Sequence, residues 1–424
     1  MTSGAYTEEC VSVRTLDNGL TVTLERLPHL HSYSAGVWIK TGSAAEREHE
    51  GGLAHFLEHL VFKGTTTRSA QQLMQEVEGR GGQFNAFTSR EYTCIYVKML
   101  AEHVHIGIDV LADIIQNATF ADLEKERNVI LEEIASIEDM PDEYAHDLIT
   151  LQHWPDHPLG RPVSGSADSV ARLTYDDVRA FQQRWYRPKN MVVSVAGNFD
   201  EEAVANQIAE CFGALPHGDT APRPTPPAFH SGTQHMHRDI AQSHVCIGFP
   251  GVPATAHERY TFELLSNTLG GGSTSRLFDR VREQEGLAYA IYSFQSAYLT
   301  AGVFGIYVGV APQNIARTLA ITREELLRMR DEPVSDAELA ANREQLKGGL
   351  LMALESSFTR MARMARSMLY YGRILPVEEL IDHIEAVTAG EINALARRTF
   401  TKDNCALLIL GPAEAQTVDR GLAL

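Results

Sequence analysis

The stretch GGLAHFLEHLVFKGTTTR, residues 51–68, decides the fold, because its last five residues recur later in the chain. Residues 64–68 (GTTTR) return in kind as residues 272–276 (GSTSR), an offset of 208 residues (272 − 64). Each copy follows a segment with helical character and precedes a helix and two strand-like stretches. A repeat on this scale predicts that the chain contains one structural unit twice.

The strand-like stretches have similar places in the two copies. They are 83–88 and 92–98 in the first copy and 288–297 and 302–310 in the second. A hairpin is predicted where VSVRTL and LTVTLERL flank the turn Asp17-Asn18-Gly19. Short strands interleaved with long helices predict an α+β protein with two similar domains, each a mainly antiparallel sheet with helices over one face.

A proline-rich run separates the two copies. Residues 214–232 contain Pro216, Pro222, Pro224, Pro226 and Pro227, a composition typical of an extended, semi-rigid linker. We therefore predict an N-terminal domain at 1–213, a linker at 214–232 and a C-terminal domain at 233–424.

The motif His55-Phe56-Leu57-Glu58-His59 lies in a segment, 51–64, that is predicted to be helical. Residues four apart share one face of a helix, so His55 and His59 point the same way. Two imidazoles can hold a zinc ion, and a carboxylate between them can take a proton from metal-bound water. The order H-x-x-E-H is a known zinc-peptidase signature. These residues alone leave open the alternative of surface histidines beside a solvated Glu58.

A second predicted helix, 122–140, carries acidic residues on an otherwise apolar face. Glu126 and Glu133 are seven residues apart, and Ile130 and Ile137 continue the same stripe. An unpaired buried charge is costly, and a bound metal would remove that cost. Because catalytic zinc usually has three protein ligands, this helix is expected to supply the third.

The second copy of the repeat lacks the histidines. Adding 208 to positions 55, 58 and 59 gives Glu263, Ser266 and Asn267, a set that cannot bind zinc through two imidazoles. We therefore expect zinc in the N-terminal domain and a metal-free C-terminal domain.

Five stretches resemble the pitrilysin and insulysin class of inverzincin peptidases, in particular its processing-peptidase-like branch, which includes the mitochondrial processing peptidase. They are GGLAHFLEHLVFKGT, GGQFNAFTSREYT, ERNVILEEI, HPLGRPVSG and SRLFDRVREQEGLAY, and the resemblance covers nearly the whole chain.

The resemblance implies roles for individual residues of the zinc site. Glu133, seven residues after the first Glu of ERNVILEE, is implied as the third ligand beside His55 and His59, with one zinc ion per chain. Glu58 is implied as the general base, and Glu126 as a support that does not bind the metal directly.

The resemblance also implies substrate contacts and a partner. Asn85 and Ala86 would hold the peptide backbone on an open strand edge, a mode that demands little sequence of the peptide. Arg282 and Tyr289 would contact the substrate across a cavity, with the phenol stabilising the tetrahedral intermediate. From the residues alone, Arg282 is expected in a surface ion pair and Tyr289 half-buried. Relatives of this length pair as two halves of a clam-shell, which implies a homodimer, or a heterodimer with an inactive relative.

Composition bounds the remaining possibilities. A hydrophobic content of 44% and a charged content of 22% are typical of a soluble protein, and no apolar run approaches the roughly 20 residues that span a membrane. A net charge of −18 argues against nucleic acid as a partner. Five cysteines, without a CxxC pair, suggest a reducing compartment. The N-terminus shows neither a secretory signal nor a transit peptide, so we expect a cytoplasmic protein.

Together these features predict a zinc-dependent endopeptidase or oligopeptidase that hydrolyses peptides or unfolded segments within an enclosed chamber. The alternative is a non-catalytic structural or substrate-binding subunit of a processing-peptidase-like heterodimer. Such subunits usually have damaged zinc motifs, whereas every ligand position is intact here.

Overall fold

The computed structural model describes residues 11–420 except 221, together with 422 and 424. Segment 1–10, on which the expectations about Cys10 and the N-terminus fall, lies outside the described residues. The chain forms two compact units. Unit 1 contains the described residues up to Ile134, Pro162–Arg223 and Leu351–Glu378, and unit 2 contains Ala135–Arg161, Pro224–Leu350 and the described residues from Glu379 onward.

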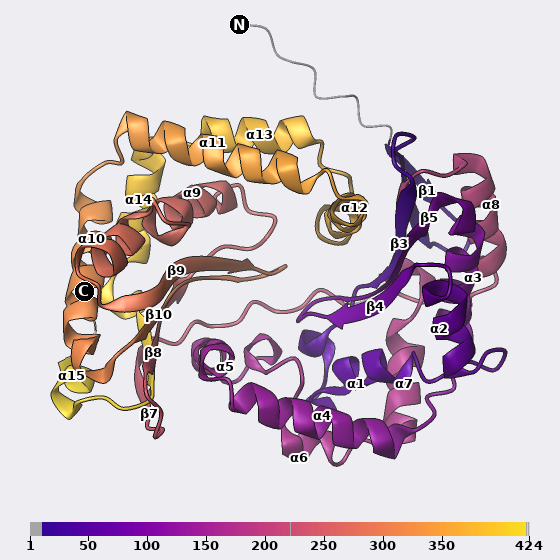
Figure 1. Cartoon of the computed structure of the whole chain (residues 1–424), viewed down its shortest axis with the longest axis horizontal. Coiled ribbons are helices and arrows are strands. Elements are labelled where there is room, and N and C mark those ends of the chain that lie inside the picture. The colour runs from indigo at the N-terminus through magenta and orange to yellow at the C-terminus, as the bar shows by residue number, and fades with distance from the viewer. Residues whose placement is uncertain (1–10, 221, 421, 423) are drawn as a thin grey trace, which may run out of the picture. The chain divides into compact units, whose positions relative to one another are not determined.

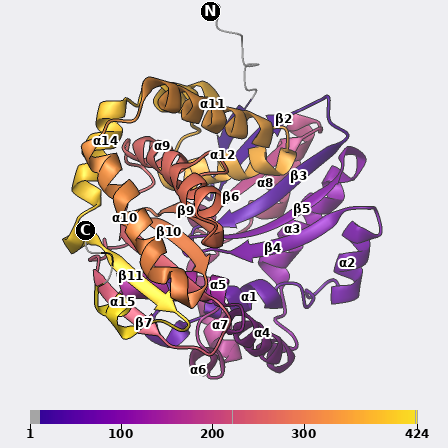
Figure 2. The same ribbon diagram turned by 60° about the vertical axis from the view of Figure 1, so that its left-hand side comes forward.

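Unit 1 is built on a six-stranded sheet in the order β1-β2-β6-β3-β5-β4. Figure 2 shows β2, β6, β3, β5 and β4 side by side. Strands β2 and β6 run parallel and the other neighbours run antiparallel. The predicted hairpin is confirmed as β1 and β2. The strands are β1 (Val11–Thr15), β2 (Thr21–Arg26), β3 (Ser32–Ile39), β4 (Gln83–Thr88), β5 (Thr93–Leu100) and β6 (Met191–Gly197).

Helices cover both faces of this sheet, which corrects the expectation of one covered face. Val37, Ile95 and Val193 belong to a large core beneath the first set of helices. On the opposite face, Trp38 and Val192 pack against α12 (Ser357–Tyr371). Both sets of alternating strand residues are apolar, so both faces need cover. The first set is α1 (Leu53–Leu60), α2 (Ala70–Glu78), α3 (Val104–Asn117), α7 (Tyr175–Trp185), α8 (Glu201–Phe212) and the start of α4 (Leu123–Glu138).

Unit 2 repeats this topology. Its sheet has the order β7-β11-β8-β10-β9, the counterpart of β2-β6-β3-β5-β4, and β7 and β11 are again the parallel pair. The repeat that residues 64–68 and 272–276 predict is therefore confirmed. The strands are β7 (Gly232–Met236), β8 (Ser243–Pro250), β9 (Ala288–Ala297), β10 (Gly302–Val310) and β11 (Ala406–Leu410).

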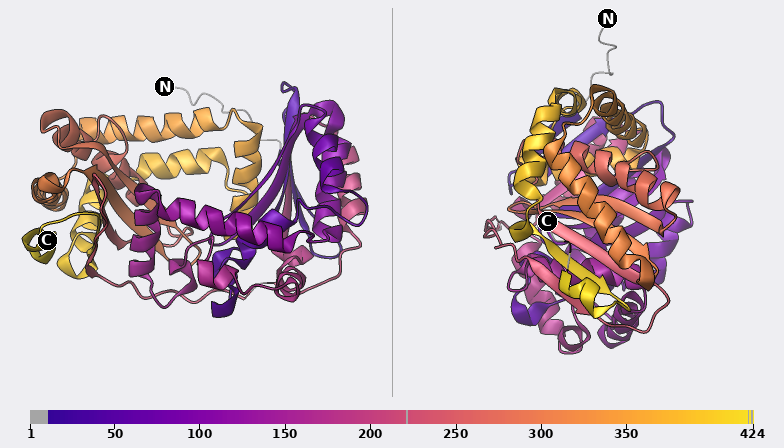
Figure 3. Two further views of the ribbon diagram at one scale, coloured as in Figure 1. Left: turned by 60° about the horizontal axis from the view of Figure 1, so that its bottom comes forward. Right: turned by 90° about the vertical axis from the view of Figure 1, so that its left-hand side faces the viewer.

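The sheet of unit 2 is also covered on both faces. Helices α9 (Arg259–Gly270), α10 (Ile315–Asp331) and α14 (Ala389–Thr399) lie over one face (Figure 1 and Figure 3). Helix α5 (Pro141–His153) lies on the other face, where Ala145 and Ile149 contact Cys246 and Leu408. The remaining helices are α6 (Ala167–Val170), α11 (Asp336–Ala353), α13 (Val377–Ala386) and α15 (Ala415–Arg420), with short 3-10 turns and a π-helical stretch, Phe278–Gln284.

The two units exchange a helix. Helix α5 comes from the first half of the sequence and completes unit 2, whereas α12 comes from the second half and completes unit 1. Met361 and Met364 of α12 are fully buried, so this helix is part of the core of unit 1. Polar contacts fix its position, because Arg360 pairs with the buried Glu25 and Ser357 hydrogen-bonds to Ser34 at 3.0 Å.

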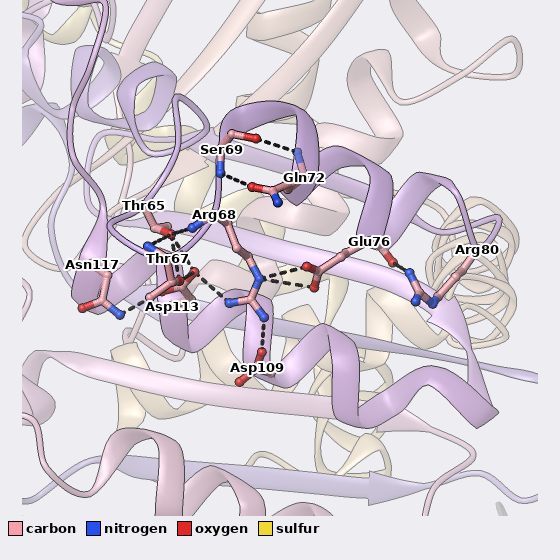
Figure 4. Close-up of polar contacts among 10 residues, drawn as sticks. All are labelled: Thr65, Thr67, Arg68, Ser69, Gln72, Glu76, Arg80, Asp109, Asp113 and Asn117. Atoms are coloured by element: carbon pink, nitrogen blue, oxygen red, sulfur yellow. Dashed lines mark hydrogen bonds and ion pairs between the residues drawn. The ribbon is translucent and has the colours of Figure 1, made fainter.

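Arg68, the last residue of the repeated GTTTR segment, joins the start of α2 to α3 (Figure 4). Its guanidinium donates to Glu76 at 3.1 Å, to Asp113 at 2.8 Å and to Asp109. The buried carboxylate of Asp113 also accepts from Thr65 and Thr67 at 2.7 and 2.8 Å. The repeated segment therefore joins α2 to α3.

Two further findings concern composition. Within the described part of the chain, no helix combines the length and the apolar character that crossing a membrane requires. Cys94, Cys211, Cys246 and Cys405 are free thiols.

Candidate metal and catalytic site

Helix α1, which carries the H-x-x-E-H motif, begins without a capping side chain at its N-cap residue Gly52. Glu46 replaces that cap: its buried carboxylate accepts from the backbone N–H of Gly52 at 2.9 Å and of Ala54 at 2.7 Å. These N–H groups have no partner within the helix, and the negative charge also favours the positive end of the helix dipole. Glu46 therefore fixes where α1 starts.

Glycines allow α1 to approach its neighbours closely. Gly52 has a φ of +88°, and a Cβ there would lie 2.5 Å from the carbonyl oxygen of Ser164. Gly165 has a φ of +75°, and its Cβ would lie 2.6 Å from the carbonyl oxygen of Gly51. Only glycine adopts such backbone without strain. The HPLGRPVSG and GGLAHFLEH stretches therefore meet as two backbones in contact.

The imidazoles of His55 and His59 point from one face of α1 toward Glu133 on α4. His55 Nε2 lies 3.5 Å from Glu133 Oε1, and His59 Nε2 lies 3.5 Å from Glu133 Oε2. One donor atom from each residue lies within 4.8 Å of the others. Among the residues that the structure describes, this is the one such group of three metal-binding side chains.

This geometry fits a zinc ion. Two donors that share one tetrahedral zinc at about 2.1 Å each are about 3.4 Å apart, close to the separations found between each imidazole and Glu133. Nε2 is the nitrogen that His55 would offer to the ion, because it faces Glu133. Two imidazoles and one carboxylate also form the donor set of several catalytic zinc sites.

The electrostatics of the three residues favour a neutral His55 beside a charged Glu133. Burial lowers the pKa of His55 to about 4, so its ring keeps a lone pair for a metal at neutral pH. Burial also opposes charge on His59, but hydrogen bonding and the charge of Glu133 raise its pKa overall. The same contact with His59 lowers the pKa of Glu133.

Glu58 lies beside this group on the same helix. Burial raises the pKa of its carboxyl, while hydrogen bonding with Thr88 and the charge of His59 limit the increase. Its Oε2 atom is buried and has no hydrogen-bond partner among the described residues. A carboxyl group held in this way, with one oxygen free, is suited to accept and return a proton.

Glu126 lies behind His59 rather than among the three donors. Its side chain is 5% exposed, and its Oε2 atom lies 3.4 Å from Nδ1 of His59. The stripe predicted on α4 is confirmed for Glu126 and Ile130, which are buried, but Ile134 rather than Ile137 completes it. The buried residues of α4 therefore follow steps of four from Glu126, whereas Ile137 is only partly buried.

The counterpart of this site in unit 2 contains amides. Asn267, which corresponds to His59, donates from Nδ2 to Asn342 Oδ1 at 2.6 Å and to Gln345 Oε1 at 3.0 Å. Asn342 lies on α11, one residue beyond the position that the offset of 208 assigns to Glu133 (133 + 208 = 341). In unit 2, amide hydrogen bonds therefore join α9 to α11, whereas in unit 1 His59 and Glu133 bring α1 and α4 together.

Asn85 and Ala86 lie on β4, the terminal strand of the unit 1 sheet. Asn85 is exposed and Ala86 is buried, as alternation along a strand requires. Because β5 pairs with one edge of β4, the other edge is where an added strand would find backbone partners.

Arg282 and Tyr289 contact each other in unit 2. Arg282 donates from Nη1 to the carbonyl oxygen of Tyr289 at 2.9 Å, and its guanidinium lies 4.7 Å from the ring centres of both Tyr289 and Phe278. Tyr289 is 79% exposed, which corrects the expectation of a half-buried side chain. The arginine covers one face of the ring and leaves the rest to solvent.

Sequence reasoning missed Glu46, Gly165 and Lys63. Lys63 lies four residues after His59, and its Nζ is 2.7 Å from Glu126 Oε1. Lys63 lies beyond Leu60, where α1 ends, so helical spacing from His59 does not predict its contact with Glu126. No local pattern indicates that Glu46 caps a helix that begins seven residues later.

Two family models match the chain. Residues 21–167 match the model "Insulinase (Peptidase family M16)", and residues 172–346 match "Peptidase M16 inactive domain". A curated relative, the "Uncharacterized zinc protease YmxG" of Bacillus subtilis (strain 168), is 38% identical over 94% of this chain and 98% of its own length. An "Uncharacterized zinc protease" of Rickettsia felis is 35% identical over 96% of this chain and 98% of its own length.

Solved structures share the fold. A protease from Helicobacter pylori superposes with a TM-score of 0.89 at 22% identity, covering 95% of this chain and all of its own. A structure from Pseudomonas fluorescens described as a peptidase M16 inactive domain gives 0.87 at 20% identity, covering 96% and 98%. At such identities the likeness shows the fold alone, whereas the curated relatives and the family models show the family. The chain belongs to peptidase family M16, the insulinase family.

Proposed function

We propose that the protein is a zinc-dependent peptidase that hydrolyses peptides or unfolded segments. The observation that carries this proposal is the convergence of His55, His59 and Glu133 within 4.8 Å, beside a Glu58 carboxyl that keeps one buried oxygen without a partner. Each group has the chemistry that metal-assisted hydrolysis needs. The names of the curated relatives support the choice of zinc.

In this mechanism His55, His59 and Glu133 would hold one zinc ion per chain. When bound, zinc supplies a Lewis acid that makes a water molecule a good nucleophile near neutral pH. The free oxygen of Glu58 accepts a proton from the attacking water and then gives it to the leaving amine. The burial that raises the pKa of Glu58 makes its carboxylate a better proton acceptor, because the protonated form is favoured there.

The substrate would bind as an added strand on β4. The backbone at Asn85 and Ala86 would pair with the peptide, so that affinity comes from hydrogen bonds common to all sequences. The exposed phenol of Tyr289, held by Arg282, would donate to the oxyanion that forms at the scissile carbonyl.

A homodimer would complete the enclosure, with the zinc site of one chain facing Arg282 and Tyr289 of the other. A heterodimer with an inactive relative is the second possibility. Sedimentation of the active protein tests both. If the protein sediments solely as a monomer of 46.9 kDa under assay conditions, the shared chamber is refuted.

The central test is the variant Glu58→Gln in a peptide-library assay with and without a chelator. We expect zinc to stay bound and cleavage to fall by at least about 10²-fold, because the proton acceptor is lost. Glu132→Gln is the matched control, because Glu132 is exposed on α4 and the substitution removes the same charge.

Three outcomes separate the alternatives. Cleavage at the wild-type rate by Glu58→Gln would refute the assignment of the base. Zinc binding without any cleavage by the wild type would favour the non-catalytic subunit. Chelator-resistant cleavage would refute zinc as the catalytic metal.

A further inference from the structure

The metal-binding face of α1 extends beyond the two histidines. His55 and His59 are four residues apart on α1, and Lys63 follows in the turn after the helix ends at Leu60, in contact with Glu126. Opposite them, Glu133 and Glu126 are spaced by seven on α4. Each carboxylate contacts two of the three side chains. Glu133 contacts His55 and His59, and Glu126 contacts His59 and Lys63.

Glu126 has a separate partner for each of its oxygens. Lys63 Nζ lies 2.7 Å from Oε1, whereas Nδ1 of His59 lies 3.4 Å from Oε2. The Glu126 side chain is only 5% exposed, so water replaces neither contact easily. Without Lys63 the carboxylate would be free to rotate toward the three donors.

Rotation of that carboxylate would matter for the metal. A ligating histidine that donates its second N–H to a carboxylate is fixed in ring orientation and in the nitrogen that it offers. Here the contact between Nδ1 of His59 and Glu126 leaves Nε2 facing Glu133. The charges also balance, because one ammonium and one divalent cation would match the carboxylates of Glu58, Glu126 and Glu133.

We propose that Lys63 is a positioning residue for the metal site, which acts by holding Glu126 against Nδ1 of His59 so that Nε2 is presented to the ion. This inference rests on the proposed metal site. It adds a residue that touches neither metal nor substrate and that acts through a chain of two contacts.

The test measures zinc affinity by competition with a chelator, independently of activity. Lys63→Met should weaken zinc binding by about 10- to 100-fold, as loss of a partner behind a ligand typically does. Lys63→Arg keeps the charge near Glu126 and should recover most of the affinity. Lys125→Met is the matched control, because Lys125 is exposed on α4 beside Glu126 and should leave the affinity unchanged.

A double-variant cycle with Glu126→Gln shows whether Lys63 acts through Glu126. If it does, Lys63→Met should have almost no further effect on zinc affinity once Glu126 is neutral. The double variant also removes both charges of the Lys63–Glu126 pair together, so it serves as the folded comparison if Lys63→Met alone fails to fold.

Each result decides a separate question. If the wild type does not bind zinc, the proposed function fails first. If the wild type binds zinc but Lys63→Met binds it equally well, the inference on Lys63 is overturned while the proposed function stands. A loss of stability in the metal-free protein with unchanged zinc affinity, or additive effects in the cycle, would also overturn the inference.

Discussion

Replacing Gly165 with alanine tests whether the close approach of two backbones fixes the start of α1. Gly165 has a φ of +75°, and an added Cβ would lie 2.6 Å from the carbonyl oxygen of Gly51 and 2.7 Å from the Cα of Gly52. The left-handed backbone costs alanine about 1–2 kcal/mol, and overpacking costs about 1–3 kcal/mol. Because the obstructing atoms are backbone, we expect Gly165→Ala to lose about 2–5 kcal/mol of stability.

Gly372 provides a matched control within unit 1. It ends α12 with a φ of +66°, and a Cβ there would meet nothing within 4 Å. Gly372→Ala should therefore cost only the backbone strain, about 1–2 kcal/mol. The difference between the two variants isolates the contact with the start of α1.

Denaturant unfolding followed by circular dichroism measures both variants, and zinc affinity is measured in parallel. Gly165→Ala should unfold at a lower denaturant concentration than Gly372→Ala and should bind zinc more weakly, because α1 carries His55 and His59. Equal midpoints for the two variants would show that the contact relaxes without cost, and the reasoning would then be wrong.

Three further predictions concern other features. Zinc at 1,000 times Kd should raise the free energy of unfolding of the wild type by about 4 kcal/mol, and His55→Ala should abolish this rise; a zinc effect that persists in His55→Ala would exclude the site. Gly348→Ala and Gly349→Ala should each stabilise α11 by about 0.5–1 kcal/mol, because a Cβ at either position meets nothing within 4 Å; destabilisation in denaturant unfolding would contradict this. Burial opposes charge on Asp113, but hydrogen bonds from Arg68 and from the side chains of Asn117, Thr65 and Thr67 lower the pKa of the Asp113 carboxyl overall. Its contribution to stability is therefore complete above the unfolded-state pKa and is lost as pH falls through the folded-state value. Arg68→Met should flatten this acid dependence, and an unchanged pH profile of unfolding would refute the role of Arg68.

The sequence predicted much of the architecture because repeats and periodicities are visible in the order of the residues themselves. The offset between residues 64–68 and 272–276 predicted two equivalent sheets, and the strands 288–297 and 302–310 match β9 and β10. The exchange of α5 and α12 was not predictable in this way. Each helix has an apolar face, but nothing in its own residues indicates which sheet that face covers.

The same distinction holds for the candidate site. The spacing of His55 and His59 predicted one shared face, and the seven-residue spacing on α4 predicted that Glu126 and Glu133 share a face. Which carboxylate meets both imidazoles depends on how α1 and α4 pack, so that choice came from the resemblance. Glu46 acts through two long-range hydrogen bonds, which no sequence period reveals.

The exchanged helix α12 has a consequence during synthesis. The strands that carry the apolar residues Trp38 and Val192 have all been synthesised once β6 ends at Gly197. Helix α12, which covers these residues, begins only at Ser357, 160 residues later (357 − 197). At about 5–20 residues per second, that face of the nascent sheet waits about 8–32 s for its cover. We expect ribosome-bound chains that stop before Ser357 to be protease-sensitive and to recruit chaperones, and chains that extend well past Tyr371 to resist proteolysis. Equal resistance at both lengths would show that the first sheet matures without waiting for the distant helix.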